Sequence, residues 1–352
     1  MKILEYSEID LEDFNGKTNK FDNVLIREWI KLMNEEGLFN YKLEFPLLSK
    51  VLSGKYRFVI QKNAKRHSEK RPSQIQISSS INVPFDINKF NFNKINSNEI
   101  MFKLNRQDEN QILNDDFIII NNSPIELGHS LLVPQLHSNL NQVLNLDSIK
   151  LALELIILSN SLNLIIGFNT VQAYSSVNHL HLHIYYLNLL NNRDSEFPFP
   201  IQNITQAERI GPNLWFLSDD VIPIPAFSLQ LCDFQNDICK FSKKIFSITD
   251  YFMKNEIPHN LVLVKSTSFT NTTPTDLLTV RAVIWPKKPA SEIPDNSMNI
   301  NFAMCELSGH IFVPKDEDYE TINENYLNKI ANQAKLNEEK FKLIKNDLKF
   351  LF

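Results

Sequence analysis

The segment from Asn178 to Tyr186 constrains this chain most, because histidine occupies every second position from 179 to 183, with leucine between. Alternation of period 2 predicts a β-strand with the side chains of His179, His181 and His183 on one face and the leucines on the other. Burying three polar rings without partners would be costly, so a purely structural role is disfavoured. Because the ordinary imidazole pKa is near neutrality, such a row suits either metal binding or nucleophilic catalysis at phosphorus.

A zinc site is the main alternative to nucleophilic catalysis, since imidazole is a good zinc ligand. At about 3.3 Å per residue, three ligands on alternate strand positions are spread over about 13 Å, which is wide for one metal, although two of them could share one. The sequence contains no Cys-x-x-Cys or His-Glu-x-x-His motif that would supply further ligands. We therefore expect neither a metal site nor a cofactor.

Composition indicates an ordinary globular protein. The chain has 352 residues, 43% of them hydrophobic and 22% charged, which is enough for one large or two ordinary domains. Its three cysteines are unpatterned, which favours a reducing compartment. No apolar run approaches the roughly 20 residues of a membrane span, and the N-terminus has no apolar signal segment. These features predict a cytoplasmic protein with no membrane partner.

Charge is uneven along the chain. The net charge is −5, yet residues 50–71 hold eight lysines and arginines against Glu69 alone, a local balance of +7. Most of these lysines are expected to be solvent-exposed surface charges without a specific role. Guanidinium groups bind phosphate bidentately, so Arg57, Arg66 and Arg71 are the candidates for a polyphosphate substrate. The basic stretch is short and the whole chain acidic, so nucleic acid is not expected as a partner.

The histidine segment resembles the His-φ-His-φ-His-φ-φ signature (φ, hydrophobic) of the histidine triad superfamily of nucleotide hydrolases and transferases. A second block, residues 121–134, is similar to the first nucleotide-binding strand pair of that superfamily. The wider pattern resembles GDP-D-glucose phosphorylases, which are related to plant GDP-L-galactose phosphorylases and to galactose-1-phosphate uridylyltransferases. Residues 54–72, 167–187 and 305–310 contain the matching blocks.

The resemblance implies a reaction and a set of roles. His181 would attack the α-phosphorus of GDP-D-glucose to form a guanylyl-histidine, and inorganic phosphate would then release GDP. A backbone carbonyl near His179 would fix the His181 tautomer, while His179 and His183 would contact phosphoryl oxygens or the leaving group. The implied substrate contacts are the side chains of Asn121, His129, Asn169 and Ser176. Asn121 stands where many members have an acidic residue for the ribose hydroxyls, and Asn169 differs by one residue in spacing.

The third histidine distinguishes the relatives. Plant GDP-L-galactose phosphorylases and uridylyltransferases have Gln at the position of His183, so histidine there favours GDP-D-glucose as the substrate. Histidine is also typical of the hydrolase branch, and hydrolysis of a capped or dinucleoside polyphosphate is therefore an alternative. GDP-L-galactose phosphorolysis is another alternative, and a nucleotide-binding regulator without turnover is a third.

The expected fold is α+β, with histidine-triad/uridylyltransferase-like antiparallel sheets, flanking helices and two similar units in one chain. Residues 1–200 would form the catalytic unit with an N-terminal extension, and residues 206–352 a degenerate unit without the triad. The second unit would repeat elements of the first. Its strands at 227–231, 260–264 and 280–285 would correspond to strands at 130–134, 164–168 and 179–187. Its helix at 236–254 would correspond to a helix at 146–162, which Asp147 would cap. Further predictions are a helix at 24–38 and strands at 56–61 and 74–83. Because both units lie in one chain, a monomer is plausible, with a homodimer as the other possibility.

Overall fold

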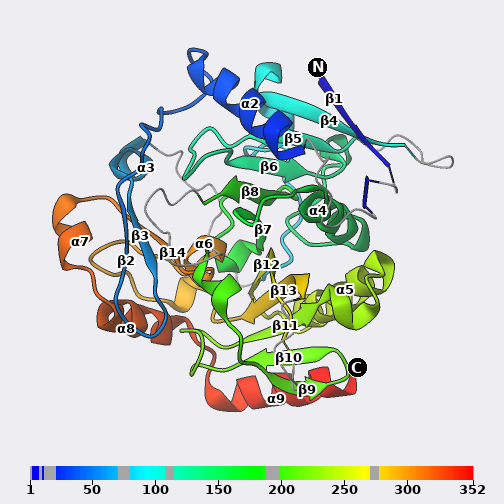
Figure 1. Cartoon of the computed structure of the whole chain (residues 1–352), viewed down its shortest axis with the longest axis vertical. Coiled ribbons are helices and arrows are strands. Elements are labelled where there is room, and N and C mark those ends of the chain that lie inside the picture. Colours follow the sequence, from blue (N-terminus) through cyan, green and yellow to red (C-terminus); the bar gives the residue numbers. More distant parts are fainter. Residues whose placement is uncertain are drawn as a thin grey trace.

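The structure is a computed structural model that describes residues 2–7, 10–11, 21–69, 80–107, 115–187, 198–269 and 277–351. Within these residues the chain forms an 11-stranded sheet and a separate 3-stranded sheet, with helices on both faces of the large sheet (Figure 1). The strand pairs are antiparallel except for two parallel pairs, β1 with β4 and β14 with β3. The predicted α+β class is confirmed.

The strands of the large sheet lie in the order β1 (Lys2–Tyr6), β4 (Ile100–Arg106), β5 (Phe117–Ile120), β6 (Ser130–Val133), β8 (Leu182–Tyr186), β7 (Leu164–Asn169), β12 (His259–Thr267), β13 (Leu278–Pro286), β11 (Ala226–Gln230), β10 (Leu214–Leu217) and β9 (Glu208–Gly211). The small sheet consists of β14 (His310–Val313), β3 (Val59–Lys62) and β2 (Ser49–Val51). The helices are α2 (Phe21–Asn34), α3 (Ala64–Glu69), α4 (Leu146–Leu158), α5 (Ile238–Lys254), α6 (Met304–Leu307), α7 (Asp316–Thr321), α8 (Glu324–Ala334) and α9 (Glu338–Phe350).

The two halves of the large sheet have the same connectivity. From one edge, after β1, the order is β4-β5-β6-β8-β7, and α4 connects β6 to β7. From the other edge it is β9-β10-β11-β13-β12, and α5 connects β11 to β12. The halves meet where β7 pairs antiparallel with β12, with Gly167 opposite Val262. The prediction of two similar units is confirmed, whereas their boundaries at residues 200 and 206 stay a prediction.

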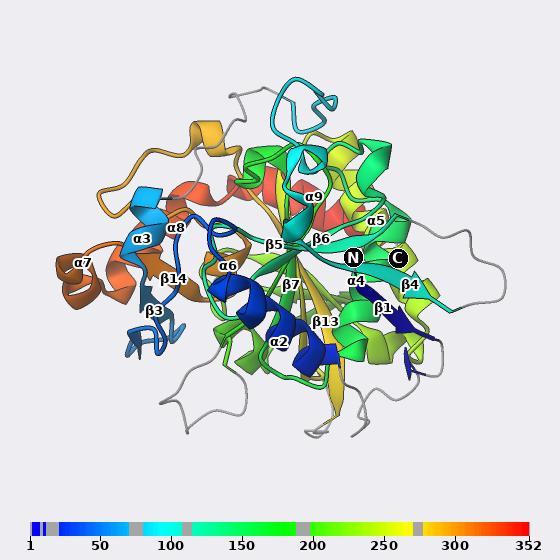
Figure 2. The ribbon, with the colours of Figure 1, turned by 90° about the horizontal axis from the view of Figure 1, so that it is seen from above.

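Two apolar layers sandwich the large sheet. Helices α4 and α5 cover one face, and the small sheet with α6, α7 and α8 lies on the opposite side (Figures 1 and 2). Along β8, Leu182 and Ile184 point into the first layer, whereas Tyr185 points into the second. Odd-numbered residues of β8, His183 among them, therefore face the side of the small sheet.

Several predicted element limits shift. The predicted helix cap at Asp147 is wrong: Asn145 is the N-cap, and its side chain accepts a hydrogen bond from the Ser148 backbone N–H at 2.8 Å. That places Asp147 inside the first turn, where its negative charge interacts favourably with the positive end of the helix dipole. The helix predicted at 24–38 occupies 21–34. The strand predicted at 74–83 lies mainly outside the described residues, and its described part, 80–83, forms no strand. Among the described helices, none combines the length and apolarity that a bilayer crossing requires.

Candidate active site

The histidine segment is a strand only in its second half. β8 begins at Leu182, so the strand predicted from His179 is wrong for its first three residues. The reason is a change of partner: Leu180 N–H donates to the Leu140 carbonyl at 2.9 Å instead of to β7. The β7–β8 ladder ends where Gly167 pairs with His183. Past this pair, the side chain of Gln142 lies between the backbones of Asn169 and His181.

Gln142 takes over the hydrogen bonds of the missing ladder. Its Oε1 accepts from His181 N–H at 3.0 Å, and its Nε2 donates to the carbonyls of His181 (3.1 Å) and Asn169 (3.0 Å). The side chain is only 1% exposed, so water does not compete for these bonds. One amide therefore fixes the backbone on both sides of the predicted nucleophile.

The hydrogen-bond partners determine the tautomer of His181. Its Nδ1 lies 2.8 Å from the His179 carbonyl oxygen, which can only accept a hydrogen bond. Nδ1 therefore carries the proton, and in the neutral ring the lone pair is on Nε2. The prediction that a carbonyl near His179 holds this ring matches the geometry. Such an arrangement suits a nitrogen nucleophile, because the carbonyl stabilises the positive charge that develops on the ring.

A second chain of bonds orients His183. The Ile125 backbone N–H donates to His129 Nδ1 at 3.0 Å, so the proton of neutral His129 is on Nε2. That nitrogen lies 3.1 Å from His183 Nδ1 and donates to it, which leaves the proton of His183 on its Nε2. Burial lowers the pKa of both rings well below 6.5, and the neighbouring histidines and Arg66 lower it further. His183 is thus a neutral hydrogen-bond donor, 5.3 Å from His181 between ring centroids.

His179 has a different environment from the other two. Its ring is fully buried beside Phe85 and Phe92, and its Nδ1 accepts from the Phe92 N–H at 3.1 Å. Burial lowers its pKa to about 4. His179 is not among the residues that line the pocket of His181 and His183, whereas its carbonyl contacts the His181 ring. In the described part of the chain, no three His, Cys, Asp or Glu side chains gather in a way that would hold a metal ion.

His181 and His183 line a cavity of about 460 Å³ on this face of the sheet. Its apolar lining includes Phe90, Ile119 of β5, Leu131 of β6 and Val177. Its polar lining includes Arg66 and, from the segment 290–306, Ser291, Asn299, Asn301 and Glu306. The two histidines lie on the wall along with Asn121, Asn169 and Ser176, so every predicted small polar contact faces the same cavity.

These polar residues have defined partners. Asn121 Oδ1 accepts from Ser123 N–H at 3.0 Å, and its amide nitrogen lies 3.1 Å from His129 Nε2. Because neutral His129 carries its proton on Nε2, that nitrogen donates to His183 and does not accept from Asn121. Asn169 Oδ1 accepts from Asn260 Nδ2 at 2.6 Å and from Met304 N–H at 3.0 Å. Asn169 therefore connects β7 to two segments in the second half of the chain. Ser176 is exposed at the cavity.

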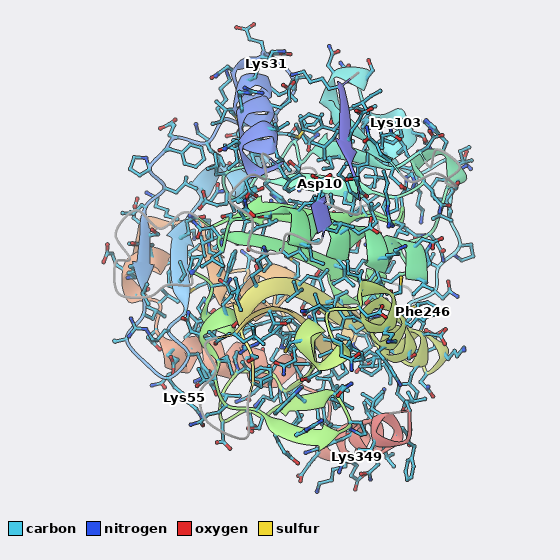
Figure 3. All side chains as sticks on the ribbon, turned by 45° about the vertical axis from the view of Figure 1, so that its right-hand side comes forward. Asp10, Lys31, Lys55, Lys103, Phe246 and Lys349 are labelled. Carbon is cyan, nitrogen blue, oxygen red and sulfur yellow. The ribbon has the colours of Figure 1, made fainter. Side chains whose placement is uncertain are left out.

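Of the three predicted arginines, the structure brings one to the cavity. Arg66 on α3 lines it, and its guanidinium donates to the Ser123 carbonyl at 2.7 Å. Arg57 is exposed in the β2–β3 turn and is not among the lining residues. Lys55 of the same turn lies at the outer edge of the molecule (Figure 3). Arg71 lies outside the described residues.

Sequence reasoning missed Glu306 and Gln142. Residues 305–310 were recognised only as a matching block, which gave no role to Glu306. Its Oε2 accepts from Ala303 N–H at 3.1 Å, and burial raises its pKa to about 7. Helix α6, which holds Glu306, packs so closely on β7 that a Cβ at Gly167 would overlap Met304. Glycine at this position allows the C-terminal segment to form one wall of the cavity.

Among its described residues, the second unit lacks a histidine row on β13, the strand that corresponds to β8. On β13, Trp285 shares the second apolar layer with Tyr185 of β8, so odd-numbered residues of both strands point to the same side. Arg281 occupies this face, fully buried, with its guanidinium 3.7 Å from the Phe269 ring centroid. It donates to the carbonyls of Ile204 (2.7 Å) and Thr267. Val283 lies opposite Val262 as His183 lies opposite Gly167, so a valine stands at the position of the third histidine.

Comparison with protein-family models decides the family. Residues 20–185 match the model described as GDPGP1-like, N-terminal domain, and residues 222–351 match GDPGP1-like, C-terminal domain. The chain belongs to the GDPGP1-like family. Both predicted site blocks, 121–134 and 178–186, fall almost entirely within the N-terminal match, while Glu306 falls within the C-terminal one.

This GDPGP1-like chain is 34% identical over 310 residues to GDP-D-glucose phosphorylase 1 of Homo sapiens, covering 86% of this chain and 76% of that protein. It is 32% identical over 336 residues to the Danio rerio protein of the same name, with 95% and 92% coverage. GDP-L-galactose phosphorylase 2 of Arabidopsis thaliana is 28% identical over 94% of this chain and 76% of its own length. Among solved structures, yeast Ap4A phosphorylase Apa2 with AMP has a similar fold, at TM-score 0.58 and 13% identity, over 90% of this chain and 97% of that one.

Proposed function

We propose that this protein catalyses phosphorolysis of GDP-D-glucose to GDP and glucose 1-phosphate through a guanylyl intermediate on His181. The observation on which the proposal rests is the Nδ1–carbonyl hydrogen bond of His181, which places the ring's lone pair on Nε2 at a cavity of nucleotide-sugar size. The names of the GDP-D-glucose phosphorylase relatives, at 32–34% identity, support the substrate.

In the first step, His181 Nε2 attacks the α-phosphorus of GDP-D-glucose. The N–P bond forms, the bridging P–O bond breaks, and glucose 1-phosphate leaves. Covalent catalysis of this kind divides one difficult displacement into two easier ones. In the second step, an oxygen of inorganic phosphate attacks the same phosphorus, the N–P bond breaks, and GDP is released. The His179 carbonyl holds the ring in one orientation for both steps.

His183 and Arg66 would stabilise the phosphoryl charge. His183 is neutral with its proton on Nε2, so it can donate a hydrogen bond to a phosphoryl or bridging oxygen. Arg66 is the predicted arginine that lines the cavity, and its charge acts on His129, His183 and Glu306. Preorganised donors and cations of this kind supply most of the catalysis in phosphoryl transfer.

The lining of the cavity suggests how the substrate lies. The base would lie against the apolar residues Ile119 and Leu131, and Asn121 would contact the ribose. The hexose would lie against the segment 290–306, where Asn299, Asn301 and Glu306 offer partners for its hydroxyls. His181 and His183 lie on the same wall, which fits attack at the α-phosphorus.

The proposal extends to organisation and location. Residues 1–200 would be the catalytic unit, and residues 206–352 a unit without its own site that supplies one wall of the cavity. Both walls come from the same chain, so a monomer would contain the complete site. Cytoplasm is the proposed location, as the reducing environment suggested by the cysteines implies.

The test is to incubate the purified protein with GDP-glucose, GDP-mannose, GDP-galactose or a cap analogue, each with and without inorganic phosphate. The proposal predicts that GDP-glucose is turned over, that turnover depends on phosphate, and that glucose 1-phosphate and GDP form in equal amounts. Release of GMP at the same rate without phosphate would contradict it and indicate a hydrolase.

A further inference from the structure

Tyr174 has a backbone conformation that tyrosine rarely adopts. It follows the 3-10 turn η4 (Val171–Ala173) as its C-cap, with φ 74° and ψ 23° in the left-handed region. Glycine and asparagine adopt this region more readily than residues with a bulky side chain. A hydrogen bond from Ser175 N–H to the Thr170 carbonyl, at 3.1 Å, closes the turn around it. Residues that keep such a conformation cluster at ligand sites, so the tyrosine side chain is a candidate for a substrate contact.

Lys287 fixes the position of the tyrosine ring. Its Nζ lies 4.4 Å from the centroid of the Tyr174 ring, a cation–π distance. Lys287 is fully buried, and the same Nζ donates to the Phe302 carbonyl. Phe302 belongs to the segment 290–306, which supplies polar lining of the cavity. The ring is therefore held between the loop that follows β7 and the segment proposed to contact the hexose.

The hydroxyl of Tyr174 is available to a ligand. The residue lines the cavity and is half-buried, and among the residues that the structure describes none forms a hydrogen bond with its hydroxyl. Burial and the nearby carboxylates of Glu306 and Asp295 raise the pKa of Tyr174 to about 12, so the phenol is neutral at physiological pH. A neutral phenol can donate one hydrogen bond and also accept one.

We propose that the Tyr174 hydroxyl forms a hydrogen bond with a hexose hydroxyl of the substrate and so favours a nucleotide sugar over the bare nucleotide. A hexose hydroxyl is uncharged and, like the phenol, both donates and accepts. A phosphoryl group suits this position less well, because the negative charges of Glu306 and Asp295 that act on the phenol would repel it. The inference rests on the proposed function, since it concerns the hexose of the same substrate.

Calorimetric binding of GDP-glucose and of GDP tests this in full-length His181→Ala, which should not consume the nucleotide sugar. Adding Tyr174→Phe keeps the ring and its contact with Lys287 and removes only the hydroxyl, so the midpoint of urea unfolding should stay at the parent value. The double variant should bind GDP-glucose about threefold to tenfold more weakly than its parent, the range expected for one neutral hydrogen bond. GDP has no hexose, so its dissociation constant should stay within twofold.

Tyr251→Phe in the same background is the matched control. It removes a hydroxyl that bonds Asp347 at 2.6 Å and does not line the cavity, so both dissociation constants should stay unchanged. An unchanged affinity of the Tyr174→Phe variant for GDP-glucose, or a loss of GDP affinity as large as that for GDP-glucose, would overturn the inference. Binding needs no turnover, so a protein that holds the hexose through Tyr174 yet fails to phosphorolyse GDP-glucose would refute the proposed function and leave this inference standing.

Discussion

Replacing Gln142 by leucine should disable His181 without removing it. The leucine side chain is similar in size but cannot form the three hydrogen bonds that Gln142 makes, at 3.0, 3.1 and 3.0 Å, to His181 N–H, His181 C=O and Asn169 C=O. A buried backbone group that loses its partner costs about 1–3 kcal/mol, so three such groups predict a loss of at least about 3 kcal/mol in the free energy of unfolding. The total stability of a domain is about 5–15 kcal/mol, so most of the variant should still fold at low temperature.

The activity of the folded fraction should fall much further than stability alone explains. A displacement of about 1 Å at a reacting group can cost roughly a hundredfold in rate. We expect a loss of that size in the single-turnover rate of guanylyl transfer from GDP-glucose, measured at saturating substrate. Urea unfolding, followed by circular dichroism, supplies the folded fraction with which each rate is corrected.

Gln202 offers a matched control far along the chain. It is also fully buried, its Oε1 accepts from Phe199 N–H at 2.9 Å, and its Nε2 donates to the carbonyls of Leu162 and Lys265, both at 2.8 Å. Gln202→Leu should therefore lose a similar amount of stability and keep the wild-type rate per folded molecule. If Gln142→Leu and Gln202→Leu lower that rate equally, or if Gln142→Leu leaves it intact, Gln142 does not position His181.

Three further outcomes follow from the same structure. His183→Gln should retain part of the phosphorolysis, because glutamine keeps a hydrogen-bond donor and acceptor; initial rates as low as those of His181→Ala would show that His183 has an acid–base role. Arg66→Ala should raise the KM for GDP-glucose or for phosphate about tenfold to a hundredfold, with exposed Lys55→Ala as the unaffected control; unchanged steady-state constants would place Arg66 outside the phosphate site. Burial raises the pKa of Glu126 from 4.5 to about 7, so the folded state binds its proton more tightly than the unfolded state does. Relative to Glu126→Gln, wild type should thus lose about 3 kcal/mol of stability between pH 4.5 and 7, measured by urea unfolding; a pH-independent difference would refute this.

The sequence predicted the site well where chemistry depends on residue type and local spacing. Alternating histidines identified His181 and His183, and the carbonyl that holds the His181 ring comes from within the same segment. The second unit was predicted because its elements follow the order of the first and because the superfamily that the sequence resembles is built from paired copies of one unit; the sheet order confirms the repeat.

The site was less predictable where it depends on segments that are distant in the chain. Strand alternation could not show that Gln142 replaces the ladder at His179–His181, because this depends on a loop 39 residues away in the chain. Charge alone did not separate Arg66, which lines the cavity, from Arg57, which lies in an exposed turn. Glu306 lies at the cavity in α6, whose Met304 packs against Gly167, and this contact joins residues far apart in the chain.

The central claim is a covalent bond between His181 Nε2 and the α-phosphorus of the substrate. The most direct test is intact-protein and peptide mass spectrometry after the protein is mixed with GDP-glucose in the absence of inorganic phosphate. We predict a mass increase of one guanylyl group on the peptide that contains His181, its absence in His181→Ala, and its disappearance with release of GDP when phosphate is added. An adduct on another residue, or phosphorolysis by His181→Ala at a rate near that of wild type, would contradict the mechanism.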